Sequence, residues 1–396
     1  MTRISDVFIV GAVRTAIGDF GGALKDIAPA ELGRTVIVEA IQRSGLTVDD
    51  VHHVVMGQVI QSEPKDAYLA RVAAVDAGIP LGVPALTLNR LCGSGVQAII
   101  SAAQMMQLGE ASVTVAGGAE SMSQSPHVLK SGRWGQKMGN TVMLDALLEV
   151  LSDPFDGFHM GVTAENVARE YGISRELQDA LAVESHRRAA SAIADGRFKA
   201  QIVPVEIKTR KGVMVFDTDE HVRGDTTAES LAALRPAFDK AGSVTAGNAS
   251  GINDGAAALV LATGEVIASR GLTPIARIIA WGHAGVDPKL MGIGPIAAVP
   301  IALARAGLTL DQIDVIEANE AFAAQACAVS QTLGFDPAKV NPNGSGIALG
   351  HPVGATGAIL TVKALYELER IDGRYALITM CIGGGQGIAL IIERTA

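Results

Sequence analysis

Few aromatic residues and few cysteines are present in this chain. Aromatic residues make up 4% of the 396 positions, and the formal net charge is -9. Because surfaces that bind nucleic acids are rich in Lys and Arg and often stack bases on aromatic rings, this composition argues against a nucleic-acid partner. The three cysteines are odd in number and far apart, which does not fit a disulfide framework and favours a reducing compartment.

Long apolar runs are also missing. The first apolar run is short and ends at Gly11, which is not the layout of a secretory signal. No uninterrupted apolar stretch is long enough to cross a bilayer. We therefore expect a cytoplasmic protein without a membrane partner. With 48% hydrophobic residues and 45 glycines, the chain is able to bury a large core in two or three domains.

The segment around Cys92 is the most informative one. A strand-like apolar run, 85–88, leads through a short turn into a helix-like run, 96–108. The N-terminus of that helix should favour the thiolate form of the cysteine. Gly93 and Gly95 permit a sharp turn and leave space for an acyl group. This pattern predicts a nucleophilic cysteine, and a buried structural cysteine is the alternative.

His351 and Asn319 lie at two further turns. His351 belongs to a glycine-dense run, 343–357, and Pro352 after it excludes it from a helix interior. We interpret this histidine as a base, with a hydrogen-bonded core histidine as the alternative. Asn319 lies where a strand-like run turns into a helix. Its side chain either caps that helix or holds a water or a histidine in place.

Cys381 lies at the edge of a glycine turn. The run 376–392 reads as a strand, a turn at 383–385 and a second strand. The backbone N–H groups of this turn, beginning with Gly383, are free to face an oxyanion. A plain hairpin with a core cysteine is the alternative.

An internal repeat organises the chain. Residues 45–57 and 307–319 resemble each other in residue type at an offset of 262, and similar elements surround both copies. Duplication of a strand-helix half predicts an α/β fold with a mostly parallel sheet covered by helices in a layered body. We predict an N-terminal domain over 1–270, which contains an inserted loop domain at about 122–250, and a C-terminal domain over 271–396.

The insertion is where we expect part of a binding site. It holds 15 of the 32 Lys and Arg residues. Its acidic residues outnumber them, so an ordinary solvated surface is the alternative. The turn at 158–161, just before a helix-like run, is placed to reach the active site.

The segments around Cys92, Asn319, His351 and Cys381 together resemble the signatures of the thiolase family, in the same order and over essentially the whole chain. The resemblance is greatest to bacterial acetyl-CoA acetyltransferases and β-ketothiolases, and it implies the layered αβαβα body of that family. Val353 stands where the family commonly has leucine, and 344–346 reads Gly-Ser-Gly where Gly-Gly-Ala is common. These small differences bear on chain-length preference.

The family mechanism, carried onto these positions, makes Cys92 the nucleophile of a ping-pong reaction and His351 the base that activates it. The implied reaction is reversible condensation of an acyl-CoA with acetyl-CoA to a 3-ketoacyl-CoA, or the reverse thiolysis, through an acyl-Cys92 intermediate. Gly383 contributes an oxyanion N–H, and Cys381 is the second acid and base. A water held by Asn319 stabilises the enolate together with His351.

The resemblance also implies a set of coenzyme A contacts. They are Arg223, Ser250, Ala246, His159, Met160, Met291, Ala321 and Phe322. Coenzyme A thioesters are substrates here, and no metal or redox cofactor is implied. The expected assembly is a homotetramer built from two dimers, and the expected substrate is acetoacetyl-CoA or another short-chain 3-ketoacyl-CoA.

Other functions remain open from the sequence. A degradative 3-ketoacyl-CoA thiolase of broader chain length uses the same residues. A decarboxylating ketosynthase generally has histidine or asparagine in place of Cys381. A non-catalytic lipid-binding relative would not need three reactive side chains on glycine turns. A dithiol redox protein is disfavoured, because no Cys-x-x-Cys pair is present.

Overall fold

The computed structural model describes residues 6–210 and 212–395 of the chain. The strands of the main sheet are β1 (Val7–Arg14), β2 (Gly18–Asp19), β3 (His53–Gly57), β4 (Ala85–Leu88), β5 (Val113–Ser121), β10 (Asn253–Thr263), β11 (Ala276–Gly285), β12 (Val315–Ala318), β13 (Tyr375–Ile382) and β14 (Gln386–Arg394). The α-helices are α1 (Pro29–Ser44), α2 (Leu69–Asp76), α3 (Ser94–Gln107), α4 (Ala146–Val150), α5 (Met160–Glu170), α6 (Arg175–Ala194), α7 (Ala228–Ala232), α8 (Gly264–Arg270), α9 (Gly294–Ala306), α10 (Ala323–Leu333), α11 (Gly346–Leu349) and α12 (Thr356–Ile371).

The main sheet is mixed, so the expectation of a mostly parallel sheet is wrong. Its 10 strands follow the order β12-β13-β14-β11-β1-β10-β5-β3-β4, with β2 on β10. Parallel pairing is confined to β3 with β4 and β5, and to β12 with β13. The other pairs are antiparallel, because a tight turn returns β13 into β14 and because β10 and β11 run against their neighbours.

The predicted duplication is present in the positions of the elements. The short 3-10 helices η1 (Val48–Asp50) and η5 (Leu310–Gln312) begin 262 residues apart, as do α3 and α12, and β5 and β13. Thr47 and Thr309 each form a capping box at these helices. The two halves of the sheet join where β1 pairs with β11.

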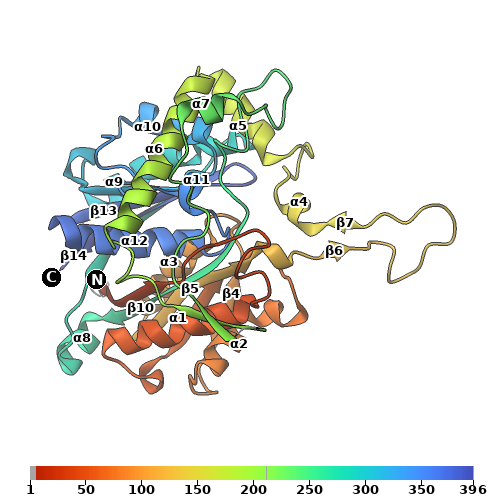
Figure 1. Cartoon of the computed structure of the whole chain (residues 1–396). Helices are drawn as coiled ribbons and strands as arrows, with labels where there is room; N and C mark the ends of the chain where they lie inside the picture. The colour runs from red at the N-terminus through yellow and green to blue at the C-terminus, as the bar shows by residue number, and fades with distance from the viewer. Residues whose placement is uncertain (1–5, 211, 396) are drawn as a thin grey trace.

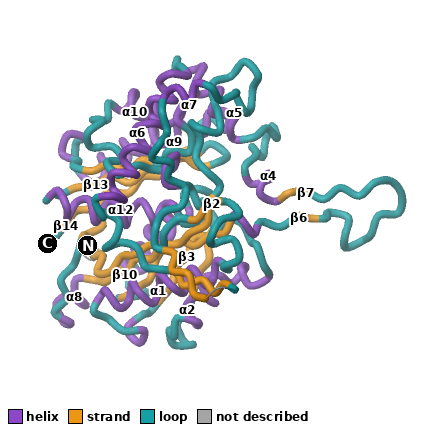
Figure 2. Tube along the Cα trace, in the orientation of Figure 1, coloured by secondary structure: helices purple, strands orange, loops and turns teal. Residues whose placement is uncertain are grey.

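The two halves stack into five layers (Figure 1, Figure 2). Helices α3 and α12 lie in the middle, since α12 contacts β12 and β13 of one half and β5 and β10 of the other. Helix α1 covers β1, β5 and β10 on one outer face, and α9 covers β11 and β14 on the other. This arrangement confirms the layered αβαβα body.

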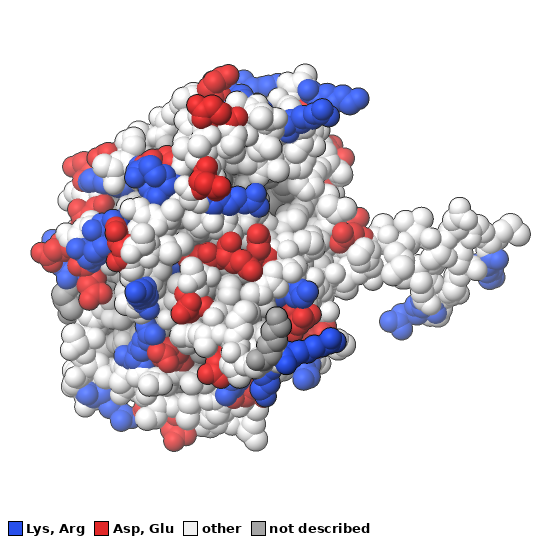
Figure 3. Space-filling model, in the orientation of Figure 1, with Lys and Arg blue, Asp and Glu red and all other residues white. Residues whose placement is uncertain are grey.

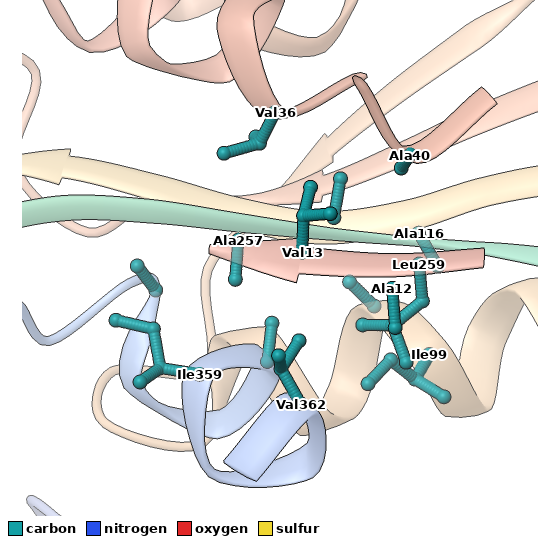
Figure 4. Packing of buried hydrophobic residues seen from close by; sticks show 14 of the residues in the cluster. Ala12, Val13, Val36, Ala40, Ile99, Ala116, Ala257, Leu259, Ile359 and Val362 are labelled. Carbon is teal, nitrogen blue, oxygen red and sulfur yellow. The ribbon is translucent and has the colours of Figure 1, made fainter. Parts of the chain in front are cut away.

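Small and branched apolar side chains fill the space between these layers. Figure 4 shows side chains of α1 on one face of the strands and those of α3 and α12 on the other. The labelled residues are Ala12, Val13, Val36, Ala40, Ile99, Ala116, Ala257, Leu259, Ile359 and Val362, all of them buried. Because β5 and β10 carry runs of alanine and glycine, helices approach this part of the sheet closely.

One helical stretch among the described residues, Pro288–Ala306, is long and apolar enough by length and composition to cross a membrane. It is two helices, because Leu290 has non-helical dihedrals (φ -121°, ψ 32°) within η4 (Pro288–Ile293), which precedes α9. Helix α9 packs against β11 and β14, and Gly294 touches the backbone at Gln386. These contacts place α9 in the outer layer of the second half.

The segment between β5 and β10 has no counterpart in the second half, where β13 returns directly into β14. It holds α4 to α7 and two short strand pairs, β6 (His127–Val128) with β7 (Leu144–Asp145) and β8 (Val205–Thr209) with β9 (Gly212–Phe216). The pair β6–β7 forms the base of an arm that projects from the body (Figure 1). Most of the arm is uncharged in Figure 3, and Trp134 and Met138 at its tip are highly exposed.

Candidate active site

Cys92 lies in the turn between β4 and α3. Leu91 before it has a left-handed backbone (φ 46°), which reverses the chain sharply, and Gly93 is the N-cap residue of α3. A side chain on Gly93 would meet Cδ1 of Ile382 at 2.6 Å, so a larger residue here would force the Ile382 side chain to shift. The predicted strand-to-helix turn is confirmed, with the helix beginning at Ser94 rather than at 96.

The environment of Cys92 keeps its thiol protonated. Burial and, to a smaller extent, the charge of Glu120 raise the pKa of Cys92 while the N–H groups of Gly383 and of Cys92 itself lower it, and together these effects bring the pKa to about 11. Because desolvation outweighs these donors, the expected thiolate is not the resting form. Attack by this sulfur therefore needs a nearby base.

His351 lies in the loop between α11 and α12, and its hydrogen bonds define its tautomer. Nδ1 lies 2.7 Å from Oγ1 of Thr356, and Nε2 lies 3.2 Å from Nδ2 of Asn319. The Thr356 hydroxyl donates to the carbonyl of Pro352 at 2.8 Å, so it accepts from Nδ1–H and Nε2 keeps its lone pair. Burial lowers the pKa of His351 to about 4, so the ring is neutral near pH 7 and can accept a proton.

Asn319 follows β12 and points its side chain at His351. It does not cap α10, whose N-cap residue is Phe322 without a side-chain cap. Its Nδ2 donates to Nε2 of His351, and its buried Oδ1 has no hydrogen-bond partner among the described residues. Of the roles considered for Asn319, holding a histidine is the one that this geometry supports, and the unpartnered oxygen is placed to bind a water.

Cys381 and Gly383 lie at the hairpin between β13 and β14. Cys381 is fully buried, and burial together with the nearby Cys92 raises its pKa well above the usual thiol range. The N–H of Gly383 donates to the sulfur of Cys92. Cys327, in contrast, lies in α10, and its thiol is directed to the carbonyl of Leu177. The hairpin therefore brings a second thiol and a backbone donor beside the first thiol.

A cavity of about 410 Å³ opens at these residues. Of the residues expected to form the site, those that line it are Cys92, His351, Gly383, Ser250, Ala246, His159, Met160, Met291, Ala321 and Phe322. Cys381 and Asn319 are buried and do not line it. Arg223 lies outside it on an exposed loop, where its backbone N–H donates to Nδ1 of His186 at 3.2 Å.

Two apolar walls line this cavity. Cys92 packs against the first, which contains Val59, Met122 and Val353. The second wall belongs to a cluster that includes Met160, Met291, Phe322 and Cys381. These walls exclude water from the thiol and offer an apolar surface to an acyl chain.

His159 stands at the second wall, where it is fixed from two sides. Its ring stacks on Phe238 with centroids 4.7 Å apart, and its Nδ1 accepts the N–H of Gly161 at 3.0 Å as the N-cap of α5. The predicted turn just before a helix is therefore present, and it reaches the cavity.

Two further residues of the site, Thr356 and Glu120, were not expected from the sequence. Thr356 orients the His351 ring, as described above. Glu120 is the penultimate residue of β5 and is fully buried beside the first wall. The available signal was a single charged residue at the end of an otherwise uncharged run, 111–119.

Comparison with known proteins places the chain in a family. The family models "Thiolase, N-terminal domain" and "Thiolase, C-terminal domain" match residues 7–265 and 272–394. The chain is 63% identical over 395 residues to beta-ketothiolase BktB of Cupriavidus necator, covering 100% of both chains. It is 50% identical to acetyl-CoA acetyltransferase of Pseudomonas aeruginosa, covering 99% of this chain and 100% of the relative.

Solved structures agree with this placement. The acetyl-CoA acetyltransferase of Bacillus anthracis superposes with a TM-score of 0.97 at 50% identity, covering 99% of each chain. Human mitochondrial 3-ketoacyl-CoA thiolase in complex with CoA superposes with a TM-score of 0.96 at 44% identity, again over 99% of each chain. The fold, the order of the motifs and these similarities lead to one conclusion: the chain belongs to the thiolase family.

Proposed function

We propose that this protein is an acyl-CoA C-acyltransferase that condenses an acyl-CoA with acetyl-CoA to a 3-ketoacyl-CoA and runs the reverse thiolysis. The observation that carries the proposal is that Cys92, His351 and Gly383 line one apolar cavity, with Cys381 directly behind its wall. Membership of the thiolase family supports it, as do relatives named beta-ketothiolase and acetyl-CoA acetyltransferase.

The first half of the reaction is acyl transfer to Cys92. The Cys92 sulfur attacks the thioester carbonyl while its proton moves to Nε2 of His351, the unprotonated ring nitrogen, which then exchanges its hydrogen bond from Asn319 for this proton. The N–H groups of Cys92 and Gly383 stabilise the oxyanion. The coenzyme A sulfur then leaves with the proton from His351, and an acyl-Cys92 thioester remains.

The second half-reaction forms the carbon–carbon bond. Cys381 first gives its proton to His351 and then, as a thiolate, accepts a proton from the methyl group of acetyl-CoA, whose enolate oxygen is stabilised by protonated His351 and a water on Asn319 Oδ1. The carbanion attacks the acyl carbonyl, and the departing Cys92 sulfur receives the proton held by His351, which leaves Cys381 as a thiol and His351 neutral again. A thiol with a raised pKa is a strong base once deprotonated, which suits a weakly acidic C–H group.

Short acyl chains are the proposed substrates, acetoacetyl-CoA among them. A cavity of about 410 Å³ must hold the reacting ends of two thioesters, which limits the acyl chain. A broader chain length is the second candidate, because Val353 in the wall beside Cys92 is smaller than leucine. Measurement of kcat/KM for thiolysis across 3-ketoacyl-CoA chain lengths separates the two.

A homotetramer is the proposed assembly. The support is the projecting arm, whose exposed apolar side chains include Trp134, Met138 and Val142. Apolar side chains this exposed are typical of a surface that meets another chain. Sedimentation that shows a monomer at micromolar concentration would overturn this assembly.

The test of the proposed function is intact mass after mixing with acetyl-CoA. We expect a gain of one acetyl group, located on the Cys92 peptide and removed by added coenzyme A. A folded protein that takes up no acetyl group would exclude the proposed chemistry and favour a non-catalytic relative. Acylation that proceeds only from a malonyl thioester, with loss of CO₂ during condensation, would favour a decarboxylating ketosynthase.

A further inference from the structure

Glu120 is a buried carboxyl group that the mechanism above does not use. It is the penultimate residue of β5 and has no exposed surface. Its Oε2 accepts the N–H groups of Val59 and Gly354, each at 2.9 Å, and its Oε1 accepts the N–H of Ile60 at 3.1 Å. A single carboxyl group therefore joins two loops to the end of one strand.

These two loops carry the wall beside Cys92. Val59 belongs to the loop after β3, and Val353 belongs to the loop that carries His351; both line the cavity. Movement of either loop would displace the wall, and movement of the second would also displace His351. Among the described residues, Glu120 is thus the side chain that hydrogen-bonds to the backbone of both.

Glycines allow the loop of His351 to pack closely against the end of β5. A side chain on Gly354 would meet Oε2 of Glu120 at 2.5 Å and Cα of Gln58 at 2.9 Å. A side chain on Gly118, two residues before Glu120, would run into the carbonyl of Gly354. The loop with His351 is therefore pressed against the end of β5, and the carboxyl group is the polar contact that holds it there.

The duplicated fold gives Glu120 an equivalent on the other side of the site. Its counterpart 262 residues later is Ile382, which directly precedes Gly383. Both strand ends therefore reach the same cavity. The second half supplies the donor to Cys92 from its turn, and the first half supplies a carboxyl group that binds the facing loop.

Glu120 also acts on Cys92 through its charge. Burial raises the pKa of Glu120 to about 8, although three backbone N–H groups lower it, and the neighbouring Asp66 raises it. In its charged form Glu120 raises the pKa of the Cys92 thiol. This influence distinguishes Glu120 from a carboxyl group that only stabilises the fold.

We propose that Glu120 is a positioning residue for acyl transfer, whose carboxyl group fastens the 59–60 segment and the loop of His351 to β5 and so fixes the wall beside Cys92. The inference rests on the proposed function. Without this group the N–H groups of Val59, Ile60 and Gly354 lose their common acceptor, so the two loops are held together less firmly and the acyl carbonyl is placed less accurately between His351 and the N–H of Gly383. A misplacement of about 1 Å from a mutation outside the reacting groups can cost about 100-fold in rate.

The experiment compares Glu120→Gln with Asp314→Asn. Asp314 also accepts two backbone N–H groups, those of Arg374 and Tyr375 at 2.7 and 3.0 Å, but it precedes β12, at the end of that strand opposite Asn319. For Glu120→Gln we expect kcat for thiolysis to fall by about 10- to 100-fold. We expect KM for coenzyme A to change by less than about threefold, because the opposite wall is untouched.

A second readout separates positioning from stability. The rate of Cys92 alkylation by iodoacetamide should follow pH along a curve shifted to lower pH in Glu120→Gln, because the charge that raises the thiol pKa is gone. Asp314→Asn should keep the wild-type curve and the wild-type kcat. Wild-type kcat in Glu120→Gln, or losses that match those of Asp314→Asn, would overturn the inference.

If Glu120→Gln does not fold, hydrogen exchange of the wild-type protein tests the inference instead. The amides of Val59, Ile60 and Gly354 should then exchange slowly and at the same rate. Exchange at independent rates would overturn the inference. Wild-type acetylation tests the proposed function separately. Normal wild-type acetylation with an unaffected Glu120→Gln variant overturns only the role of Glu120.

Discussion

Replacing His351 by asparagine tests the proton transfer on which acyl transfer depends. Asparagine keeps a polar side chain in the loop but cannot accept the proton of Cys92. In the wild-type site a protonated thiol with a pKa of about 11 faces a neutral imidazole with a pKa of about 4. The proton therefore stays on sulfur at rest and moves to His351 only as the sulfur attacks.

The two pKa values set the magnitude of the effect. Moving the proton from Cys92 to His351 costs on the order of 10 kcal/mol before the new charges attract each other. Attraction between the new thiolate and the new imidazolium offsets part of this cost. For two unit charges about 4 Å apart, the attraction is about 4 kcal/mol at an effective dielectric constant near 20. Without His351 the proton must go to solvent, and at pH 7 a thiol with a pKa of about 11 is ionised in about one molecule in 10,000.

The assay is acetyl incorporation into Cys92, followed by rapid quenching and mass measurement at several pH values. We expect His351→Asn to acetylate about 100- to 10,000-fold more slowly than wild type at pH 7. Its rate should rise about tenfold per pH unit between about pH 7 and 10, because hydroxide replaces the missing base. The wild-type rate should stay flat over the same range, since His351 is neutral throughout.

The control for this prediction is His283→Asn. His283 lies on β11 outside the cavity, with Nε2 2.8 Å from Oε1 of Gln97, and its loss should leave both the rate and the pH profile unchanged. The reasoning is refuted if His351→Asn acetylates within tenfold of wild type, or if its rate does not depend on pH.

Three further predictions address the other parts of the molecule. Cys381→Ser should still take an acetyl group onto Cys92, but it should no longer exchange deuterium from labelled acetyl-CoA into water, since only the second half-reaction needs Cys381. Loss of both activities together would contradict this division of roles. Iodoacetamide should label Cys92 before Cys327 and Cys381, because Cys92 lines the cavity and the other two are buried. Prior acetylation should protect Cys92. Faster labelling of Cys327 would show that Cys92 is not the reactive thiol. Asp219→Asn should lower the free energy of unfolding by about 3–5 kcal/mol in urea titrations. In the wild type the fully buried Arg14 bonds to Asp219 at 2.7 and 2.9 Å, and the variant leaves Arg14 without this charge partner. A loss below about 1 kcal/mol would be incompatible with this reasoning.

Local sequence was enough to place three of the site elements. Cys92, His351 and Cys381 each lie at a turn whose glycines and prolines restrict the backbone within a few residues, and the structure places all three at those turns. The repeat at an offset of 262 also indicated the duplicated body. Helix positions were less exact: α3 begins two residues before the expected position, and the four-residue α11 was not expected.

Tertiary structure decided what the turns do together. Strand direction was misjudged because pairing of β10 and β11 with β1 depends on segments hundreds of residues apart. Asn319 could cap a helix or hold a histidine by sequence alone, and the approach of His351, 32 residues later, decides between them. Glu120 was missed because its partners lie 60, 61 and 234 residues away.

The protonation states of Cys92 and His351 also could not be predicted from local sequence. A cysteine at a helix N-terminus suggested a thiolate, and that argument considered only the helix. Desolvation by the two apolar walls, which come from distant segments, raises the pKa of Cys92 and lowers that of His351. The sequence alone therefore determined which chemical groups stand at the turns, because turn geometry is local. Only the tertiary structure decided their charge and their partners, because burial and hydrogen bonding depend on everything that packs around them.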